Sequence, residues 1–177
     1  FRPYTLANAT GIPLSYSISP ESDTWRNVAK DSQDDFTFAR SHQKIREYKQ
    51  QSHRIWLKIG DWFEVQPIAV NRVGTFFRHA IHKSKSPIRI IIEVRLTESA
   101  RKMVTIRSAI KIFSKVSLPI QIFKQSDHAI DDLYENTLIG VVESNAEMYV
   151  PLQHADSRFV IRPADRDLHA ISESSLC

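Results

Sequence analysis

The side chains in this chain that could do acid-base or metal chemistry are few and poorly grouped. His79 and His82 are the most closely spaced histidine pair. Residues three positions apart on a strand point to opposite faces, so this pair does not suit a shared metal ion. The segment 127–132, Asp-His-Ala-Ile-Asp-Asp, could supply a general base, but it has no evident nucleophile beside it. We interpret this segment as a solvated polar connection.

Sequence motifs for catalysis and phosphate binding are also missing. The chain has no Gly-x-Ser-x-Gly, His-Glu-x-x-His or Cys-x-x-Cys pattern, and its four glycines leave little material for a phosphate-binding loop. Its single cysteine, Cys177, cannot form an internal disulfide, which fits a reducing cytosolic setting. We predict a protein that is not an enzyme and that uses no metal and no cofactor.

The charge balance argues against nucleic-acid binding. Lys and Arg number 24, Asp and Glu number 20, the net charge is +4 and the pI is about 9.3. This is a mixed surface, without the basic stripe that nucleic-acid binders display. The densest basic stretches are residues 40–54 and the pair Lys83 and Lys85. We interpret them as solvated loops, with weak attraction to anionic lipid headgroups as the alternative.

The elements that would position these side chains are predicted to be short β-strands. In the segment 88–94, residues 88, 90, 92 and 94 are apolar and Arg89 and Glu93 lie between them, which is the period of a strand with one buried face. Turn-forming residues separate further segments of this kind. The expected strands cover residues 54–59, 63–70, 73–81, 88–94, 102–106, 118–122, 138–142, 148–152 and 158–161. Many short strands at close spacing predict an all-β sandwich or barrel.

Two regions lie outside this simple pattern. Trp25, Trp56 and Trp62 are expected to be core or interface residues, with an aromatic ligand platform as the alternative. Residues 30–52 are rich in Asp, Gln, Lys and Arg and look strand-like only at two phenylalanines. The second half of that range is expected to be a short helix or a mobile loop.

One stretch of the chain occurs twice. Residues 4–16 resemble residues 110–122, at an offset of 106 residues, and each contains a short strand, a polar kink and an apolar-Pro-apolar strand. The offset predicts neighbouring copies of one β module, an arrangement that usually builds binding surfaces. Pro13 and Pro119 take equivalent places and are expected at an edge, a strand start or a bulge, because proline donates no backbone hydrogen bond. An exposed edge can accept a peptide as an added strand.

Five segments, in their order along the chain, are similar to the repeats of the adaptor-binding domain in the chorein, or vacuolar protein sorting thirteen, family. They are Asn8–Leu14, Ile59–Ile68, Asn71–Arg78, Val104–Ile110 and Tyr149–Leu152. The resemblance extends from residue 1 to about residue 162. It implies an all-β fold of tandem β-sandwich-like repeats of short antiparallel strands. Residues 1–102 would be a nearly complete first repeat, and residues 103–177 the N-terminal part of the next.

The resemblance also implies a function. Family members are long cytosolic bridge proteins that carry lipids between organelles, and this domain, of about six β repeats, recruits them by binding adaptors with Pro-x-Pro motifs. The expected partners are Pro-x-Pro-containing organelle adaptor proteins and neighbouring repeats, with membranes reached through the adaptors. The expected location is cytoplasmic and peripheral, at organelle membranes and contact sites. The alternative is an architectural spacer with no direct ligand, and no peptide-binding residue is assigned.

The resemblance implies a structural role for Asn8, because the family's repeats carry an asparagine at this place. An asparagine side chain can satisfy backbone groups at a kink, which would let the strand bend before Gly11. Ser114 and Ser117 replace these two residues in the second copy, so that kink must be held differently or more loosely. Asn8 also begins a glycosylation sequon, Asn-Ala-Thr, which would indicate secretion if it were used.

Overall fold

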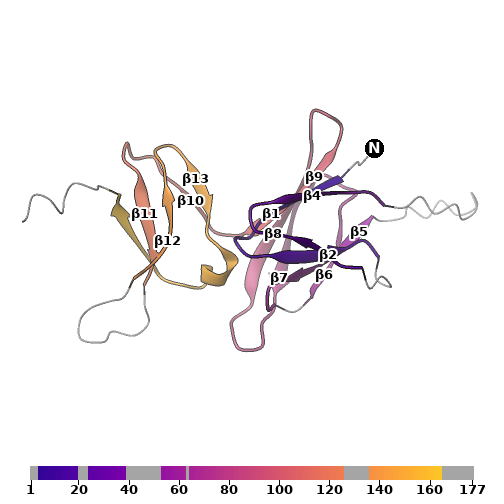
Figure 1. The fold of residues 1–177 in the computed structure, drawn as a ribbon, viewed down its shortest axis with the longest axis horizontal. Helices are drawn as coiled ribbons and strands as arrows, with labels where there is room; N and C mark the ends of the chain where they lie inside the picture. Colours follow the sequence, from indigo (N-terminus) through magenta and orange to yellow (C-terminus); the bar gives the residue numbers. More distant parts are fainter. Residues whose placement is uncertain (1–3, 20–23, 39–52, 63, 126–135, 165–177) are drawn as a thin grey trace, which may run out of the picture. The chain divides into compact units, whose positions relative to one another are not determined.

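The computed structural model describes residues 4–19, 24–38, 53–62, 64–125 and 136–164 of the chain (Figure 1). These residues form strands and one short 3₁₀ helix, η1 (Leu152–His154), with no α-helix among them. The strands are β1 (Tyr4–Ala9), β2 (Leu14–Ser17), β3 (Arg26–Val28), β4 (Gln33–Phe36), β5 (Arg54–Ile59), β6 (Val65–Ala69), β7 (Gly74–Ala80), β8 (Ile88–Leu96), β9 (Lys102–Ser108), β10 (Lys111–Phe113), β11 (Ile120–Lys124), β12 (Thr137–Val142), β13 (Glu147–Tyr149) and β14 (Phe159–Pro163). The predicted all-β fold is confirmed.

The chain divides into two compact units. Unit 1 comprises Phe1–Ala109 together with Pro151–Ala155, and unit 2 comprises Ile110–Val150 and Asp156–Cys177. Unit 1 has a five-stranded sheet in the order β4-β1-β9-β8-β7 and a four-stranded sheet in the order β3-β2-β5-β6 (Figure 1). All neighbouring strands in these sheets are antiparallel except β1 and β9, which are parallel.

The two sheets of unit 1 enclose one hydrophobic core. Ile88, Ile90, Ile92 and Val94, the alternate apolar residues of β8, are all buried, with exposed fractions of 7% or less. They belong to the same cluster as Leu57 and other apolar residues of the four-stranded sheet. Burying a side chain of this size contributes about 1.5 to 3 kcal/mol. The sandwich is therefore built by the period-two alternation that the sequence displays.

Of the three tryptophans, Trp62 follows the core interpretation. Trp62 is buried and belongs to the core cluster of unit 1. Trp56 is half-buried on β5, and Trp25 is half-buried with the Lys58 ammonium 3.7 Å from its ring centroid. All three tryptophans lie in unit 1, which makes tryptophan fluorescence a specific reporter of that unit.

Unit 2 repeats the strand pairing of unit 1. It has a two-stranded sheet, β10-β13, and a three-stranded sheet, β12-β11-β14. Leu14 of β2 lies opposite Val28 of β3. Ile120, the residue at the same place in the second copy, lies opposite Val142 of β12. β11 also pairs with β14 as β2 pairs with β5, and β10 pairs with β13 as β1 pairs with β4. The repeat seen in the sequence is thus a repeat of hydrogen-bonding register.

The turn before the fourth strand of each copy, β4 and β13, is repeated as well. Asp31 precedes β4 with φ of 56°, and Asn145 precedes β13 with φ of 57°. Asp and Asn are the residues other than glycine that tolerate this left-handed conformation most readily. The two copies therefore turn with the same backbone geometry although their sequences differ there.

The predicted repeat boundary, between residues 102 and 103, stays a prediction. β9 begins at Lys102 and is hydrogen-bonded between β1 and β8 of unit 1. The compact units instead change at Ala109 and Ile110. A repeat defined by sequence and a unit defined by packing therefore need not share their ends.

Most predicted strands are present, with shifts of a few residues at their ends. The stretch 148–152 differs, because its strand stops at Tyr149 and Leu152 begins η1. The short strands β3 and β4 were not predicted as such, since their polar residues lack the alternation of a half-buried strand. The rest of the range 30–52 from residue 39 to residue 52 lies outside the described residues.

Candidate functional site at the Asn8 kink and the sheet edges

The kink after β1 is organised by one buried side chain. The Asn8 amide nitrogen donates to the backbone carbonyls of Ile12 at 2.8 Å, Ala29 at 3.0 Å and Val28 at 3.2 Å. Its side-chain oxygen accepts hydrogen bonds from the Thr10 backbone at 3.1 Å and from Thr10 Oγ1 at 2.7 Å. Asn8 is 2% exposed. One side chain thus connects the end of β1, the kink and the end of β3.

This geometry has a direct chemical consequence for the sequon. The Asn8 side-chain amide is buried and engaged by three carbonyls, so it is not accessible as a glycosylation acceptor in the folded protein.

Gly11 lies within the kink and has a φ of +76°, a left-handed conformation that favours glycine. The kink carries the chain from β1 in the five-stranded sheet to β2 in the four-stranded sheet.

The second copy keeps the backbone of this kink but loses its side-chain network. The backbone N–H of Ser114 donates to the Ala146 carbonyl at 3.0 Å, as the backbone N–H of Asn8 donates to the Ser32 carbonyl at 3.0 Å. Ser114 is 2% exposed, and its hydroxyl oxygen is buried with no hydrogen-bond partner among the described residues. Ser117 is not among the described residues with positive φ.

The other residues with chemical potential do not assemble into a site. His79 is exposed on β7, whereas His82 is half-buried with its ring 5.1 Å from that of Trp62. No group of three potential metal ligands occurs among the described residues. The acidic segment 127–132 lies outside them. No helix in the described parts of the chain is long and apolar enough to cross a membrane.

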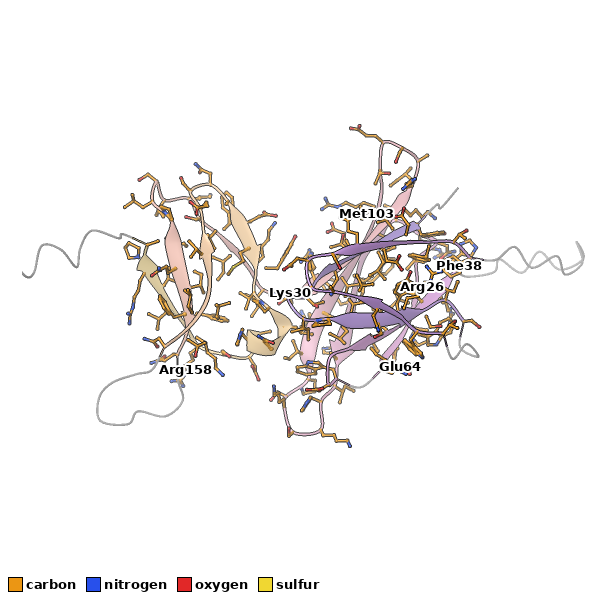
Figure 2. The ribbon with its side chains drawn as sticks, in the orientation of Figure 1. Arg26, Lys30, Phe38, Glu64, Met103 and Arg158 are labelled. Atoms are coloured by element: carbon orange, nitrogen blue, oxygen red, sulfur yellow. The ribbon has the colours of Figure 1, made fainter. Side chains whose placement is uncertain are left out.

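A polar cluster that the sequence did not point to joins the two sheets of unit 1. The Tyr16 hydroxyl on β2 donates to Asp34 Oδ2 on β4 at 2.6 Å, and the Arg26 guanidinium lies 3.5 Å from the same carboxylate. Figure 2 shows Arg26 in unit 1. Burial, and then the bond to Asp34, raise the pKa of Tyr16. No local pattern connects these residues, because they meet only when the sheets stack.

The two repeat-equivalent prolines lie at strand starts rather than at edges. Pro13 immediately precedes β2 and Pro119 immediately precedes β11. Both strands are internal, since β2 lies between β3 and β5 and β11 lies between β12 and β14. Of the three places expected for these prolines, the strand start is the one observed. They therefore mark no site for strand addition.

The edges of unit 1 differ in length and composition. The edge strands are β4, β7, β3 and β6. β3 has three residues, β4 has four, and β6 contains Pro67, which cannot donate to an added strand. β7 has seven residues and no proline. Among the described residues no strand pairs with its outer side, so β7 is the edge best able to accept a peptide.

The amino-acid sequence is similar to a known family of protein domains and to two lipid transfer proteins. Residues 24–176 match the family model described as the adaptor binding domain of vacuolar-sorting associated protein 13. The chain is similar to the human intermembrane lipid transfer protein VPS13D, with 26% identity over 183 residues, and to Drosophila melanogaster Vps13D, with 25% identity over 182 residues. These alignments cover 88% and 91% of this chain but 4% of each relative.

Proposed function

Because the family model covers most of its length, the chain belongs to the vacuolar-sorting associated protein 13 adaptor-binding domain family, and we propose that it binds adaptors through short Pro-x-Pro peptides. The relatives are named as intermembrane lipid transfer proteins. The proposed role of this chain is to recruit such a protein to organelle membranes and contact sites, with the membrane reached through the adaptor. The free seven-residue edge strand β7 is the observation that supports peptide binding by this chain.

The Pro-x-Pro spacing suits addition to an edge strand. In an extended peptide, residues two positions apart direct their backbone groups and their side chains to the same sides. Both prolines can therefore turn their donor-free nitrogens away from β7, while the central residue pairs with it. The fixed φ of proline also lowers the entropy cost of ordering the peptide.

The surface around β7 is suited to proline rings. Phe77, at the middle of β7, is 53% exposed, and Ile81, just beyond the strand, is 52% exposed. The Arg78 guanidinium donates to the Phe77 carbonyl at 2.8 Å, and the Arg89 guanidinium carbon lies 5.8 Å from the Phe77 ring centroid. We place one proline of the peptide against the Phe77 ring, with Arg78 moving aside as the backbone pairs.

Calorimetric titration tests this proposal. The probe is a synthetic peptide with one Pro-x-Pro motif, and its control has both prolines replaced by alanine. We expect modest affinity for the first peptide and markedly weaker affinity for the second. Phe77→Lys should reduce binding, whereas Leu96→Lys, at a residue of β8 that is 60% exposed, should not.

Two outcomes would contradict the proposal. Equal affinity for both peptides would exclude recognition directed by proline. Absence of binding to the folded chain would support the alternative, that these repeats are architectural spacers and that the peptide site lies in other repeats. Equal binding by Phe77→Lys and the unmodified chain would keep adaptor binding but move it away from β7.

A further inference from the structure

A short segment between two strands of unit 2 belongs to the core of unit 1. The chain forms β13, contributes Pro151–Ala155 to unit 1, and then forms β14. Leu152 is 0% exposed and lies in the hydrophobic cluster that fills the sandwich of unit 1, with Ala155 packed against that cluster. The core of unit 1 is therefore completed by a residue that lies more than 40 positions beyond Ala109.

The segment docks on the kink that Asn8 organises. The Leu152 amide donates to the Thr10 carbonyl at 2.8 Å. Gly11 packs closely against Pro151. A Cβ added at Gly11 would lie 2.6 Å from the Cβ of Pro151 and 2.9 Å from its Cα. Gly11 is thus required both for its positive φ and for this close approach.

Pro151 and Leu152 are chemically suited to this place. Proline fixes its own φ, here −53°, and it needs no partner for a backbone N–H. Leu152 supplies both the apolar side chain and the single backbone donor that reaches Thr10. The 3₁₀ turn that follows is closed by the bonds from His154 N to Pro151 O and from Ala155 N to Leu152 O.

We propose that the Thr10–Gly11 kink is a docking socket for a Pro-Leu segment of the neighbouring repeat, and that docking of Pro151–Leu152 stabilises unit 1. In the second copy, the residue equivalent to Gly11 is Ser117, which carries a Cβ. In the first copy, the residues at the positions of Pro151 and Leu152 are Thr37 and Phe38, because β4 pairs with β1 in the register in which β13 pairs with β10. The second copy thus lacks the glycine that the socket requires.

Urea unfolding of the full chain, followed by tryptophan fluorescence, tests this stabilisation, because every tryptophan lies in unit 1. Leu152→Ala should lower the fluorescence midpoint by on the order of 1 M urea, the shift expected when a buried leucine is truncated in a small domain. Leu152→Met, which keeps the apolar volume, should shift it much less. Gln153→Ala, at the exposed neighbour in η1, is the matched control and should leave it unchanged.

A second control separates docking from general destabilisation. Ile122 is 0% exposed in unit 2, so Ile122→Ala removes as much buried surface without touching the socket. The proposal requires the fluorescence midpoint to fall further for Leu152→Ala than for Ile122→Ala. A midpoint for Leu152→Ala equal to that of Gln153→Ala, or to that of Ile122→Ala, would overturn it.

Discussion

Asn8 shows how one side chain can hold a backbone kink in place. Replacing it by serine removes the amide that donates to Ile12, Val28 and Ala29, and leaves those carbonyls to find other donors. We expect Asn8→Ser to lower the free energy of unfolding by on the order of 1 to 3 kcal/mol, the usual cost of an unsatisfied buried polar group. Urea unfolding by tryptophan fluorescence measures this change.

A neighbouring asparagine provides the control for that measurement. Asn27 lies exposed on β3, and its side-chain oxygen accepts a solvent-exposed hydrogen bond from the Ser15 hydroxyl. Asn27→Ser should therefore leave the unfolding free energy nearly unchanged. Equal midpoints for Asn8→Ser and Asn27→Ser would show that the Asn8 network contributes little to stability.

Ser114 offers the reverse experiment. Its hydroxyl is buried without a hydrogen-bond partner among the described residues, at the place that Asn8 occupies in the first copy. An asparagine there could reach carbonyls equivalent to those that Asn8 holds. We expect Ser114→Asn to slow amide hydrogen exchange in β10 and β13, measured by mass spectrometry, while Ser117→Asn, at an exposed position, should not. Faster exchange in Ser114→Asn would show that the second kink has no room for this network.

At the scale of elements, an aromatic cluster ties β1 and β4 to the start of β5. The Tyr4 hydroxyl lies 2.7 Å from His53 Nδ1, and the Phe38 ring stacks on the His53 ring with centroids 4.4 Å apart. Phe38 is labelled in Figure 2. Burial, and then the charge of Lys102, lower the pKa of His53. Burial also raises the pKa of Tyr4, so both side chains favour their neutral forms.

The lowered pKa of His53 predicts a pH dependence of stability. The unfolded chain binds a proton at His53 more readily than the folded chain, so this contribution is fully present above about pH 6.5 and is lost as the pH falls through the folded pKa. We expect the unfolding free energy to decrease between pH 7 and pH 5. His53→Phe should flatten part of that decrease, and His79→Phe, at an exposed residue of β7, should not. Identical pH profiles for the two variants would contradict this assignment.

At the scale of the whole molecule, the two units differ in how much core they hold. In the described residues of unit 2 the buried hydrophobic side chains are Ile122, Val142 and Val150, whereas unit 1 holds a much larger cluster drawn from two sheets. We expect unit 2 to unfold first in urea, because stability grows with the apolar area that a unit buries. Far-UV circular dichroism should then change at urea concentrations where tryptophan fluorescence does not. Coincident transitions would show that the chain unfolds as one cooperative unit.

The sequence predicted the elements well where the pattern is local. The alternation in residues 88–94 identified β8 and its inward face, and the offset of 106 residues identified two copies that share one register. The polar kink in the repeated segment was visible in the sequence, whereas the structural role of Asn8 was implied by the resemblance to the family's repeats. Edges could not be identified in this way, because Pro13 and Pro119 precede strands that the sheets place internally.

Period-two alternation, turn residues and the internal repeat by themselves determined that this chain is all β, which faces are buried, and that one stretch of it occurs twice. Each of these signals acts between residues close in the chain or between copies of one pattern. Only the tertiary structure decided that β1 lies parallel to β9, that Tyr16 meets Asp34, and that Leu152 completes the core of unit 1. These contacts join distant segments, and the closing of long loops depends on how whole sheets stack, which no local pattern encodes.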